Sequence, residues 1–517
     1  MNYRYVFSQL GLLFLVLSLI MLVMAGSFFV THIFVHDYII DPYARTALIF
    51  SGAIGLVIGG GLYLLTRKGS KQLGRREAML LVAMSWLIGA AYAGLPFYFW
   101  ATINPNVGND HPFSSFIDCY FEAMSGLTTT GATILTDIES TPRSLLLWRA
   151  LTHWLGGLGI VVLFVAVLPS LGVGAKKLFR LETPGPSPKG LRPHIRETAR
   201  ALMLIYSSIT VAAILAIRAT GAMGWFESIC HALSMVSTGG LSTRDASIGA
   251  FDSVSLDIIC LFFMFLAGVN FALFYMLTQG RWRAVLKDTE LRVYFFLKVI
   301  VILVVTFNIW GHDIISTAGR VIESTSLAQS LRFSAFQTIA LHTGTGFVTA
   351  DYDPWPLLSR TLLVGLMFIG GCAGSTAGGL KVIRFWMLLK ILVSEIEKTF
   401  RPNVIRPIRI GNSTMDADVK LGTVVFTLSF TMLLLLGAAA LLFLEPADSP
   451  NDVATALSAS LATLGNIGPG LHGVGATQNY AWFSPGSKIV LSLLMALGRL
   501  EIFTLLVLCA PKFWKAN

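Results

Sequence analysis

The stretch His231–Asp245 reads HALSMVSTGGLSTRD, in which an apolar segment stops at Ser237-Thr238-Gly239-Gly240 and turns polar and charged. The same plan occurs three more times along the chain. It breaks at Gly131 in FSSFIDCYFEAMSGLTTTGATILTD, at Gly346 in SLRFSAFQTIALHTGTGFVTADY and at Gly468 in DVATALSASLATLGNIGPGLHG. With Gly239 marking the second copy, the intervals are 108, 107 and 122 residues. A near-constant interval of this size indicates a duplicated structural unit.

Composition identifies the surroundings in which these copies fold. Of 517 residues, 55% are hydrophobic and 13% are charged, whereas a soluble domain carries about 25% charged residues. The mean hydropathy is +0.71, and apolar runs near the ~20 residues that span a bilayer recur throughout. The first run lacks the small-residue cleavage site of a signal peptide. We therefore expect an integral membrane protein with spans at 5–30, 43–66, 77–100, 144–168, 198–221, 254–278, 293–312, 357–390 (interrupted), 421–444 and 486–510.

Basic residues indicate the sidedness. They gather in alternate loops, at 67–76, 176–200, 281–292 and 390–409, and at the C-terminal end. Under the positive-inside rule these loops and both termini are cytoplasmic. The net charge of +10 is then a topology signal, and no nucleic-acid partner is expected. The five cysteines are scattered without a metal-binding or disulfide pattern, so we expect buried thiols.

Each copy of the unit lies between two spans and is too short and polar to cross the bilayer. Its first part has the pattern of a half-helix, and its glycine then permits strained backbone. Non-helical backbone at membrane depth is tolerated only where protein or a water-filled cavity satisfies it. One such loop alone is more simply a turn or a packing site. Four in the same place favour a ring of carbonyls that replaces the hydration shell of a monovalent cation.

Acidic residues follow three of the four glycines. Asp137 and Asp245 lie six residues after their glycine and Asp351 lies five after, while the fourth copy has no such acid. We expect these three side chains at the outer mouth of the pathway, where they would concentrate cations.

The four loops resemble the filter segments of the Trk/Ktr/HKT superfamily of potassium and sodium transporters. Four further segments resemble the TrkH/TrkG branch of that superfamily: HWLGGLGIVVL from His153, RLETPGPSPKGLRPHIRETARALMLIY from Arg180, FIGGCAGSTAGGLKVIRF from Phe368 and LGRLEIFTLLVL from Leu497. The resemblance covers nearly the whole chain. His153, where many members have Gln, and Ala377, which replaces a glycine, depart from the pattern.

This resemblance implies an all-α membrane protein with four pseudo-symmetric membrane–pore–membrane repeats around one pore and two extra N-terminal helices. The expected parts are 1–70 for the two extra helices, then 71–180, 181–285, 286–410 and 411–517 for the repeats. Members form homodimers and sit on a ring of TrkA-like cytosolic nucleotide-binding subunits. The chain has no nucleotide-binding fingerprint of its own, so such control would come from that partner. The expected location is a bacterial inner membrane.

In this superfamily, glycine at the filter position of all four repeats goes with potassium, and serine in the first goes with sodium. All four positions are glycine here, so the resemblance implies potassium uptake, with K⁺ as the transported ion and no cofactor. The expected filter residues are Thr129, Thr130, Gly131, Ser237, Thr238, Gly239, Gly344, Thr345, Gly346, Asn466, Ile467 and Gly468. A sodium-permeable or non-selective relative is the alternative, and channel-like or proton-coupled flux stays open. An intramembrane enzyme is a distant alternative, because HExxH, GxSxG and paired carboxylates are missing.

The glycine-rich run GGCAGSTAGG at 370–379 lies inside an otherwise apolar span and is a poor helix former. The resemblance implies an intramembrane loop that obstructs the pore below the filter. Arg499, inside the last span, is costly unless functional, and Glu501 at i+2 does not face it. We expect Arg499 at the pore axis. The expected gate residues are Gly370, Gly371, Gly374, Ser375, Thr376, Gly378, Gly379, Lys381 and Arg499.

Three other polar residues within apolar segments are expected to be structural. Glu122 should accept hydrogen bonds from a neighbouring loop, and Arg149 and His153, four residues apart, should form a network behind it.

Overall fold

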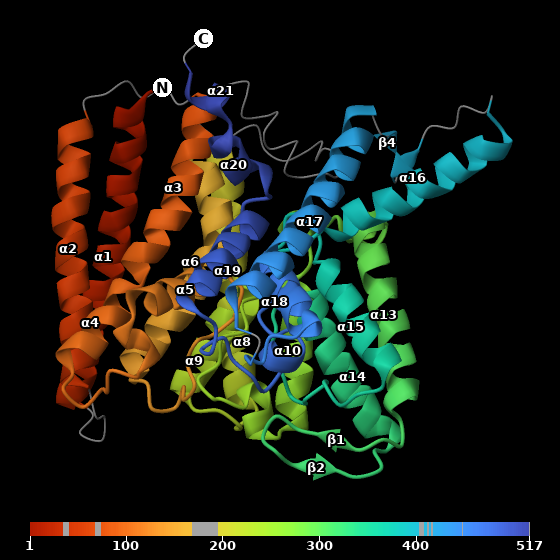
Figure 1. The fold of residues 1–517 in the computed structure, drawn as a ribbon, viewed down its shortest axis with the longest axis horizontal. Coiled ribbons are helices and arrows are strands. Elements are labelled where there is room, and N and C mark those ends of the chain that lie inside the picture. The colour runs from red at the N-terminus through yellow and green to blue at the C-terminus, as the bar shows by residue number, and fades with distance from the viewer. Residues whose placement is uncertain are drawn as a thin grey trace.

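The computed structural model describes residues 1–34, 41–67, 74–167, 195–402, 408–410, 413–414, 417–446 and 448–515. Within these residues the chain is predominantly helical with almost no strand, which confirms the all-α membrane fold. The strands form two small antiparallel hairpins, β1 (Ile314–Ile315) with β2 (Val321–Ile322) and β3 (Arg409–Ile410) with β4 (Ser413–Thr414). Both termini lie at the same end of the molecule (Figure 1), where Arg76 donates a hydrogen bond to the carbonyl of Lys515.

Six helical segments of the described chain are long and apolar enough to cross a membrane. They are α1 (Tyr3–Phe34), α2 (Pro42–Thr66), α3 with α4 (Arg75–Ala93 and Leu95–Ile103), α8 (Ile195–Ala219), α13 (Thr289–Ile309) and α17 (Ala417–Leu444). At the fourth predicted span, α6 (Arg143–Val167) runs over 25 residues. On α2 the apolar side chains of Val57 and Leu65 are 75% and 84% exposed, as expected of a helix that faces lipid.

Two predicted spans are wrong as continuous helices. The 254–278 span divides into α10 (Val254–Ala267) and α11 (Phe271–Thr278), which are bent by 93°. The break arises because the Asn270 side chain caps α11 at Ala272 and the amide of Phe271 bonds to Gly374 instead of its own helix.

The 486–510 span divides into α19 (Pro485–Arg499) and, after a bend of 111°, α20 (Phe503–Leu506) with the 3₁₀ turn η5 (Val507–Cys509). Glu501 and Ile502 have φ of 55° and 57° at this bend. Two successive residues with positive φ cannot continue a right-handed helix.

The predicted interruption at 357–390 is present, between α15 (Leu357–Phe368) and α16 (Val382–Phe400). From there α16 projects away from the helical bundle (Figure 1). The remaining short elements are α12 (Trp282–Leu286), α21 (Pro511–Trp514), η1 (Pro112–Ser114), η3 (Ser247–Phe251) and η4 (His472–Val474).

Four short helices lie inside the bundle: α5 (Phe116–Leu127), α9 (Trp225–Val236), α14 (Leu327–His342) and α18 (Val453–Gly465). Each is buried at its C-terminal half and ends in an irregular loop. Ion pairs tie two of them to neighbouring helices. Lys488 of α19 lies 2.7 Å from Asp118 of α5, and Arg332 of α14 lies 2.6 Å from Asp257 of α10. The first pair joins the last long helix to the first short one, which closes the arrangement on itself.

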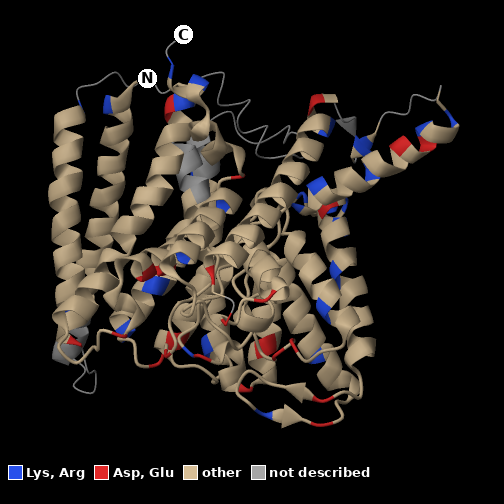
Figure 2. Cartoon of the chain, viewed as in Figure 1, with Lys and Arg blue, Asp and Glu red and all other residues tan. Residues whose placement is uncertain are grey.

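Charged residues are sparse through the middle of the bundle and more frequent towards its two ends (Figure 2). Basic residues of α16 and α21 lie towards the end that carries the termini. Several residues behind the sidedness prediction, in 68–73, 168–194 and 403–407, lie outside the described residues.

Candidate functional site

The four loops that follow the short helices share one backbone path. Each holds a glycine in the left-handed region, with φ between 70° and 91°: Gly131, Gly240, Gly346 and Gly468. The residue two positions earlier is left-handed too, with φ between 54° and 75°: Thr129, Thr238, Gly344 and Asn466. Because β-branched threonine adopts this region rarely, the strain at Thr129 and Thr238 points to a function.

The second loop corrects the sequence prediction by one residue. Gly240, not Gly239, takes the place of the other three glycines. Gly239 corresponds to Thr130, and Ser237 is the C-cap of α9, where its hydroxyl donates to Leu233 at 2.8 Å. The spacing to the following acid carries this signal, since Asp245 lies five residues after Gly240, as Asp351 does after Gly346.

At each of the four glycines, one loop packs against a carbonyl group of another loop, and these contacts form a closed ring. A Cβ added at Gly131 would overlap the carbonyl oxygen of Gly239, and one at Gly468 would lie 2.8 Å from that of Thr130. The other two glycines are packed against the next loop in the same manner: Gly240 against the carbonyl of Thr345, and Gly346 against that of Ile467. Each loop therefore touches the next, and the fourth returns to the first. Only glycine fits at these contacts.

Three loop amides donate hydrogen bonds to carbonyls of the short helices that precede them. The N–H groups of Thr130, Gly239 and Ile467 each donate to a carbonyl five residues earlier, at 2.8–2.9 Å. The carbonyl oxygens of the same three residues lie at the ring contacts with the glycines of the adjacent loops. The four glycines also border one cavity of about 80 Å³. The geometry suits binding of a small dehydrated cation by backbone oxygen.

In three of the repeats, the side chain nine residues before the loop glycine forms a hydrogen bond with the chain that follows the loop. Glu122 accepts a hydrogen bond from the amide of Ile134 at 2.9 Å, in the loop that follows its own helix, where the sequence predicted a neighbouring loop. His231 bonds through Nε2 to Ser242 at 2.9 Å, and Gln337 donates to the carbonyl of Ala350 at 3.1 Å.

In the fourth loop, Ser458 accepts from the amide of Leu471 at 3.0 Å. Gln337 was not predicted from the sequence, although it lies nine residues before Gly346, as Glu122 does before Gly131 and His231 before Gly240.

The predicted network behind the first loop is also present. Arg149 lies 2.5 Å from Glu122 and donates to the carbonyl of Ser242 at 2.9 Å. His153 bonds to Ser234 at 2.9 Å. The Glu122–Arg149 pair is buried, and its hydrogen bonds fix the first and second loops to each other.

The three predicted acids occupy different places. Asp245 borders the cavity and accepts from the amide of Ile138 at 2.8 Å, and burial raises the pKa of its carboxyl. Asp137 is exposed and accepts from Ser140, while Asp351 accepts from the amide of Asp353 at 3.0 Å. Arg244, which sequence reasoning did not select, borders the cavity as well and pairs with two glutamates. The three acids therefore do not form one ring of charge.

Residues 370–381, which contain the predicted gate residues from Gly370 to Lys381 and are called the gate segment below, pack against the ends of the short helices. Ile369 and Leu380 bridge its two ends. The Thr376 hydroxyl lies 3.2 Å from the carbonyl oxygens of both Val236, the last residue of α9, and Ala267. A Cβ at Gly378 would lie 2.5 Å from the carbonyl oxygen of Gly465, the last residue of α18.

Arg499 is 4% exposed and holds this segment from the last long helix. Its guanidinium donates to the carbonyl of Thr376 at 2.5 Å and to that of Gly156 at 3.0 Å. Glu501 turns away from it and pairs with Arg384. Lys381 donates to the carbonyls of Ala377 and Gly378. A buried positive charge thus bridges the segment and α6.

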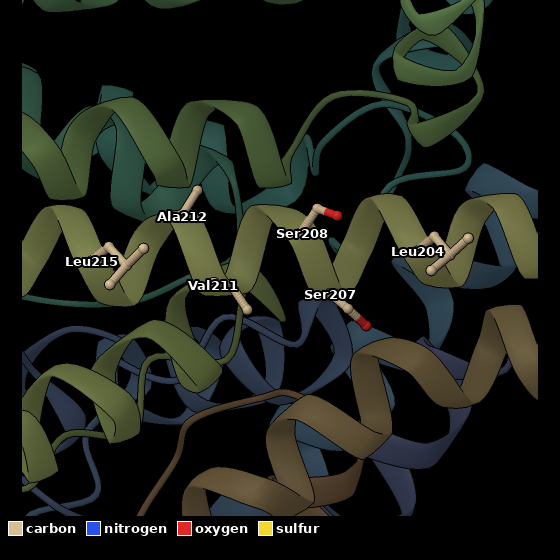
Figure 3. A pocket seen from close by; sticks show the side chains of 6 residues that line it. All are labelled: Leu204, Ser207, Ser208, Val211, Ala212 and Leu215. Atoms are coloured by element: carbon tan, nitrogen blue, oxygen red, sulfur yellow. The ribbon is translucent and has the colours of Figure 1, made fainter.

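A second hollow, of about 420 Å³, lies along α8 alone (Figure 3). It is bordered by Leu204, Ser207, Ser208, Val211, Ala212 and Leu215. Two hydroxyls on one helix flank provide no converging set of polar groups, so this hollow is not a candidate site.

Residues 45–516 match the TrkH family, described as a cation transport protein. The chain is 38% identical over 464 residues to the "Trk system potassium uptake protein TrkH" of Salmonella typhimurium, covering 89% of this chain and 91% of that protein. It is 34% identical to the protein of the same name from Vibrio parahaemolyticus, over the full length of both.

The crystal structure of the potassium transporter TrkH from Vibrio parahaemolyticus superimposes with a TM-score of 0.84 at 32% identity, covering both chains fully. The relatives are named as transport proteins and not as enzymes. The chain therefore belongs to the TrkH family of cation transport proteins.

Proposed function

We propose that this chain takes up potassium ions across the cytoplasmic membrane through a filter made of the carbonyls of the four loops. The observation that carries the proposal is the closed ring in which each loop glycine packs against a carbonyl of the next loop. A ring of this kind offers oxygen ligands at a spacing set by backbone and not by mobile side chains.

The filter is assigned to the loop residues in their corrected register: Thr129–Gly131, Thr238–Gly240, Gly344–Gly346 and Asn466–Gly468. Potassium is favoured because all four ring positions are glycine, and because relatives that align over most of the chain are named as potassium uptake proteins. Of the predicted mouth acids, Asp245 is given the role of attracting cations, since its carboxyl borders the cavity.

The gate is assigned to residues 370–381 together with Arg499. Contacts of the segment with Val236 and Gly465 support an obstruction below the filter. The Arg499 guanidinium adds a positive charge there, which repels an approaching cation. Opening then requires the bond from Arg499 to Thr376 to break.

The wider arrangement follows the family resemblance. The proposal keeps four repeats at 71–180, 181–285, 286–410 and 411–517 after two extra helices, and both termini in the cytoplasm under the positive-inside rule. It includes a homodimer and a TrkA-like nucleotide-binding subunit on the cytoplasmic face. The word "system" in the names of the relatives supports a separate partner.

The test is cation flux into liposomes that contain the purified chain, with K⁺, Rb⁺, Na⁺ and Li⁺ gradients compared at fixed pH. We expect K⁺ and Rb⁺ to enter faster than Na⁺, and Gly131→Ser to lose that preference. Equal Na⁺ and K⁺ flux in the wild type would refute potassium selectivity and favour the non-selective alternative. If no cation enters, Arg499→Ala or added regulatory subunit should open the pathway, and failure of both would refute the function.

A further inference from the structure

Glu290 is a buried carboxylate that contacts the gate segment and that the proposed function does not use. It is the second residue of α13 and is 8% exposed. Its Oε1 accepts a hydrogen bond from the amide of Ala373 at 2.7 Å and another from the amide of Ile383 at 3.2 Å. Ala373 lies within the gate segment, and Ile383 lies in the first turn of α16. One oxygen atom therefore contacts both the gate segment and the start of α16.

The start of α16 explains why an acceptor is needed at this place. The first amides of a helix have no partner within the helix and require a cap. Lys381, the N-cap residue of α16, provides no side-chain acceptor, and its ammonium is turned to the carbonyls of Ala377 and Gly378. Glu290 supplies the missing cap from a different helix.

The same carboxylate fixes the segment against α13. Burial of a charge is costly unless hydrogen bonds compensate, and the bonds that the structure shows to Glu290 come from the two amides of the segment and of α16. If the segment moved together with the first turn of α16, both bonds would break, and the carboxyl group and this turn would lose their partners at once. This coupling favours two distinct positions of the segment over a gradual range.

We propose that Glu290 is a positioning residue whose two hydrogen bonds, to Ala373 and Ile383, hold the gate segment in place below the filter. This pair of bonds is called the clasp, and Glu290 the latch. The proposal rests on the proposed function only in taking the segment as the gate. The clasp itself can be tested without ion flux.

The reporter is a thiol placed on the loop. Ser375 is partly buried, and its hydroxyl bonds within the loop to Cys372. Ser375→Cys, combined with Cys509→Ser to remove the exposed native thiol, provides a site whose reaction with a water-soluble maleimide reports loop opening. The full chain in lipid nanodiscs, which expose both faces, is compared with Glu290→Ala, Glu290→Gln and Asp288→Asn. Asp288 is the matched control, because it is an acid at the same helix end that caps Leu291 of its own helix at 2.8 Å.

Loss of the clasp should raise the rate of labelling about tenfold in Glu290→Ala, equivalent to about 1.4 kcal/mol in the opening equilibrium. Glu290→Gln keeps an acceptor oxygen without the charge and should lie between Glu290→Ala and the wild type. Asp288→Asn should match the wild type. If Glu290→Ala does not fold, Glu290→Gln against Asp288→Asn carries the test.

Wild-type rates in both Glu290 variants, or an equal rise in Asp288→Asn, would overturn the latch. Potassium flux in liposomes is measured in parallel. Faster labelling with a several-fold higher K⁺ flux and an unchanged K⁺-to-Na⁺ ratio supports the latch on a working gate. Faster labelling with no cation flux in any variant, even with Arg499→Ala, supports the clasp but refutes the proposed function.

Discussion

Substitution of Gly240 by alanine tests the register of the second filter loop. Gly240 has φ of +80°, and a Cβ there would overlap the carbonyl oxygen of Thr345. Gly239 has no left-handed backbone, and its added Cβ would instead overlap the ring of His153. An alanine is therefore unfavourable at both positions, but for different reasons. At Gly240 the obstacles are the left-handed backbone and the backbone carbonyl of Thr345, whereas at Gly239 the obstacle is the His153 side chain.

The expected magnitude follows from the left-handed geometry. Placing a Cβ in this region costs about 1–2 kcal/mol, and the overlap with Thr345 adds to it. If the strain is relieved by moving the Thr345 carbonyl, one oxygen ligand is lost from its place in the ring. A change of 1–2 kcal/mol is a factor of about 5–30 in an equilibrium. We expect the K⁺-over-Na⁺ preference of Gly240→Ala to fall by about that factor.

The assay is K⁺ and Na⁺ flux in liposomes for Gly240→Ala, Gly239→Ala and each combined with His153→Ala. Removal of the His153 ring should relieve Gly239→Ala, because the obstacle is a side chain. It should not relieve Gly240→Ala, because the obstacle there is backbone. Wild-type selectivity in Gly240→Ala, together with an unrelieved loss in Gly239→Ala, would refute this register and restore Gly239 as the ring position.

Three further predictions address the gate, the ring closure and the outer mouth. Arg499→Ala removes both bonds to Thr376 and Gly156 and should raise K⁺ flux without any partner; unchanged flux and open probability would contradict its role. Lys488→Ala leaves the largely buried Asp118 unpaired and should cost about 3 kcal/mol of stability, seen as a lower melting temperature that Asp118→Asn partly restores. Burial raises the pKa of the Asp245 carboxyl, so acidification neutralises this group at a higher pH than an ordinary aspartate. K⁺ uptake should therefore decline a few-fold as the external pH falls. An identical pH profile in Asp245→Asn would contradict this prediction.

Hydropathy and spacing predicted those features of the fold that depend on local sequence. The four short helices were predicted because apolar faces and glycine breaks repeat at similar intervals. The interruption at 370–379 was predicted because glycine-rich sequence is a poor helix former. The contact from Glu122 to its loop followed from the cost of an unpaired charge at membrane depth.

Features that depend on distant partners were not predictable in this way. The break after Ala267 was missed because hydropathy does not show that the amide of Phe271 bonds to Gly374, far along the chain. The latch contact of Glu290 was missed for the same reason, since its two partner amides carry no side-chain signal. The choice between Gly239 and Gly240 was missed because either residue can adopt a left-handed conformation.

The strained residues two positions before the ring glycines show how the fold and the site are linked. Thr129 and Thr238 are left-handed at a cost of about 1–3 kcal/mol each, and Asn466 is left-handed at a smaller cost, because asparagine tolerates this region better than threonine does. Each is held by a hydrogen bond from its amide to a carbonyl three residues earlier, at 3.0–3.2 Å. The third loop has Gly344 at this position, which adopts the same conformation without the strain. That loop is therefore the one whose path is least determined by its own sequence and most dependent on its neighbours, among them the gate residue Gly378 that packs beside Gly344.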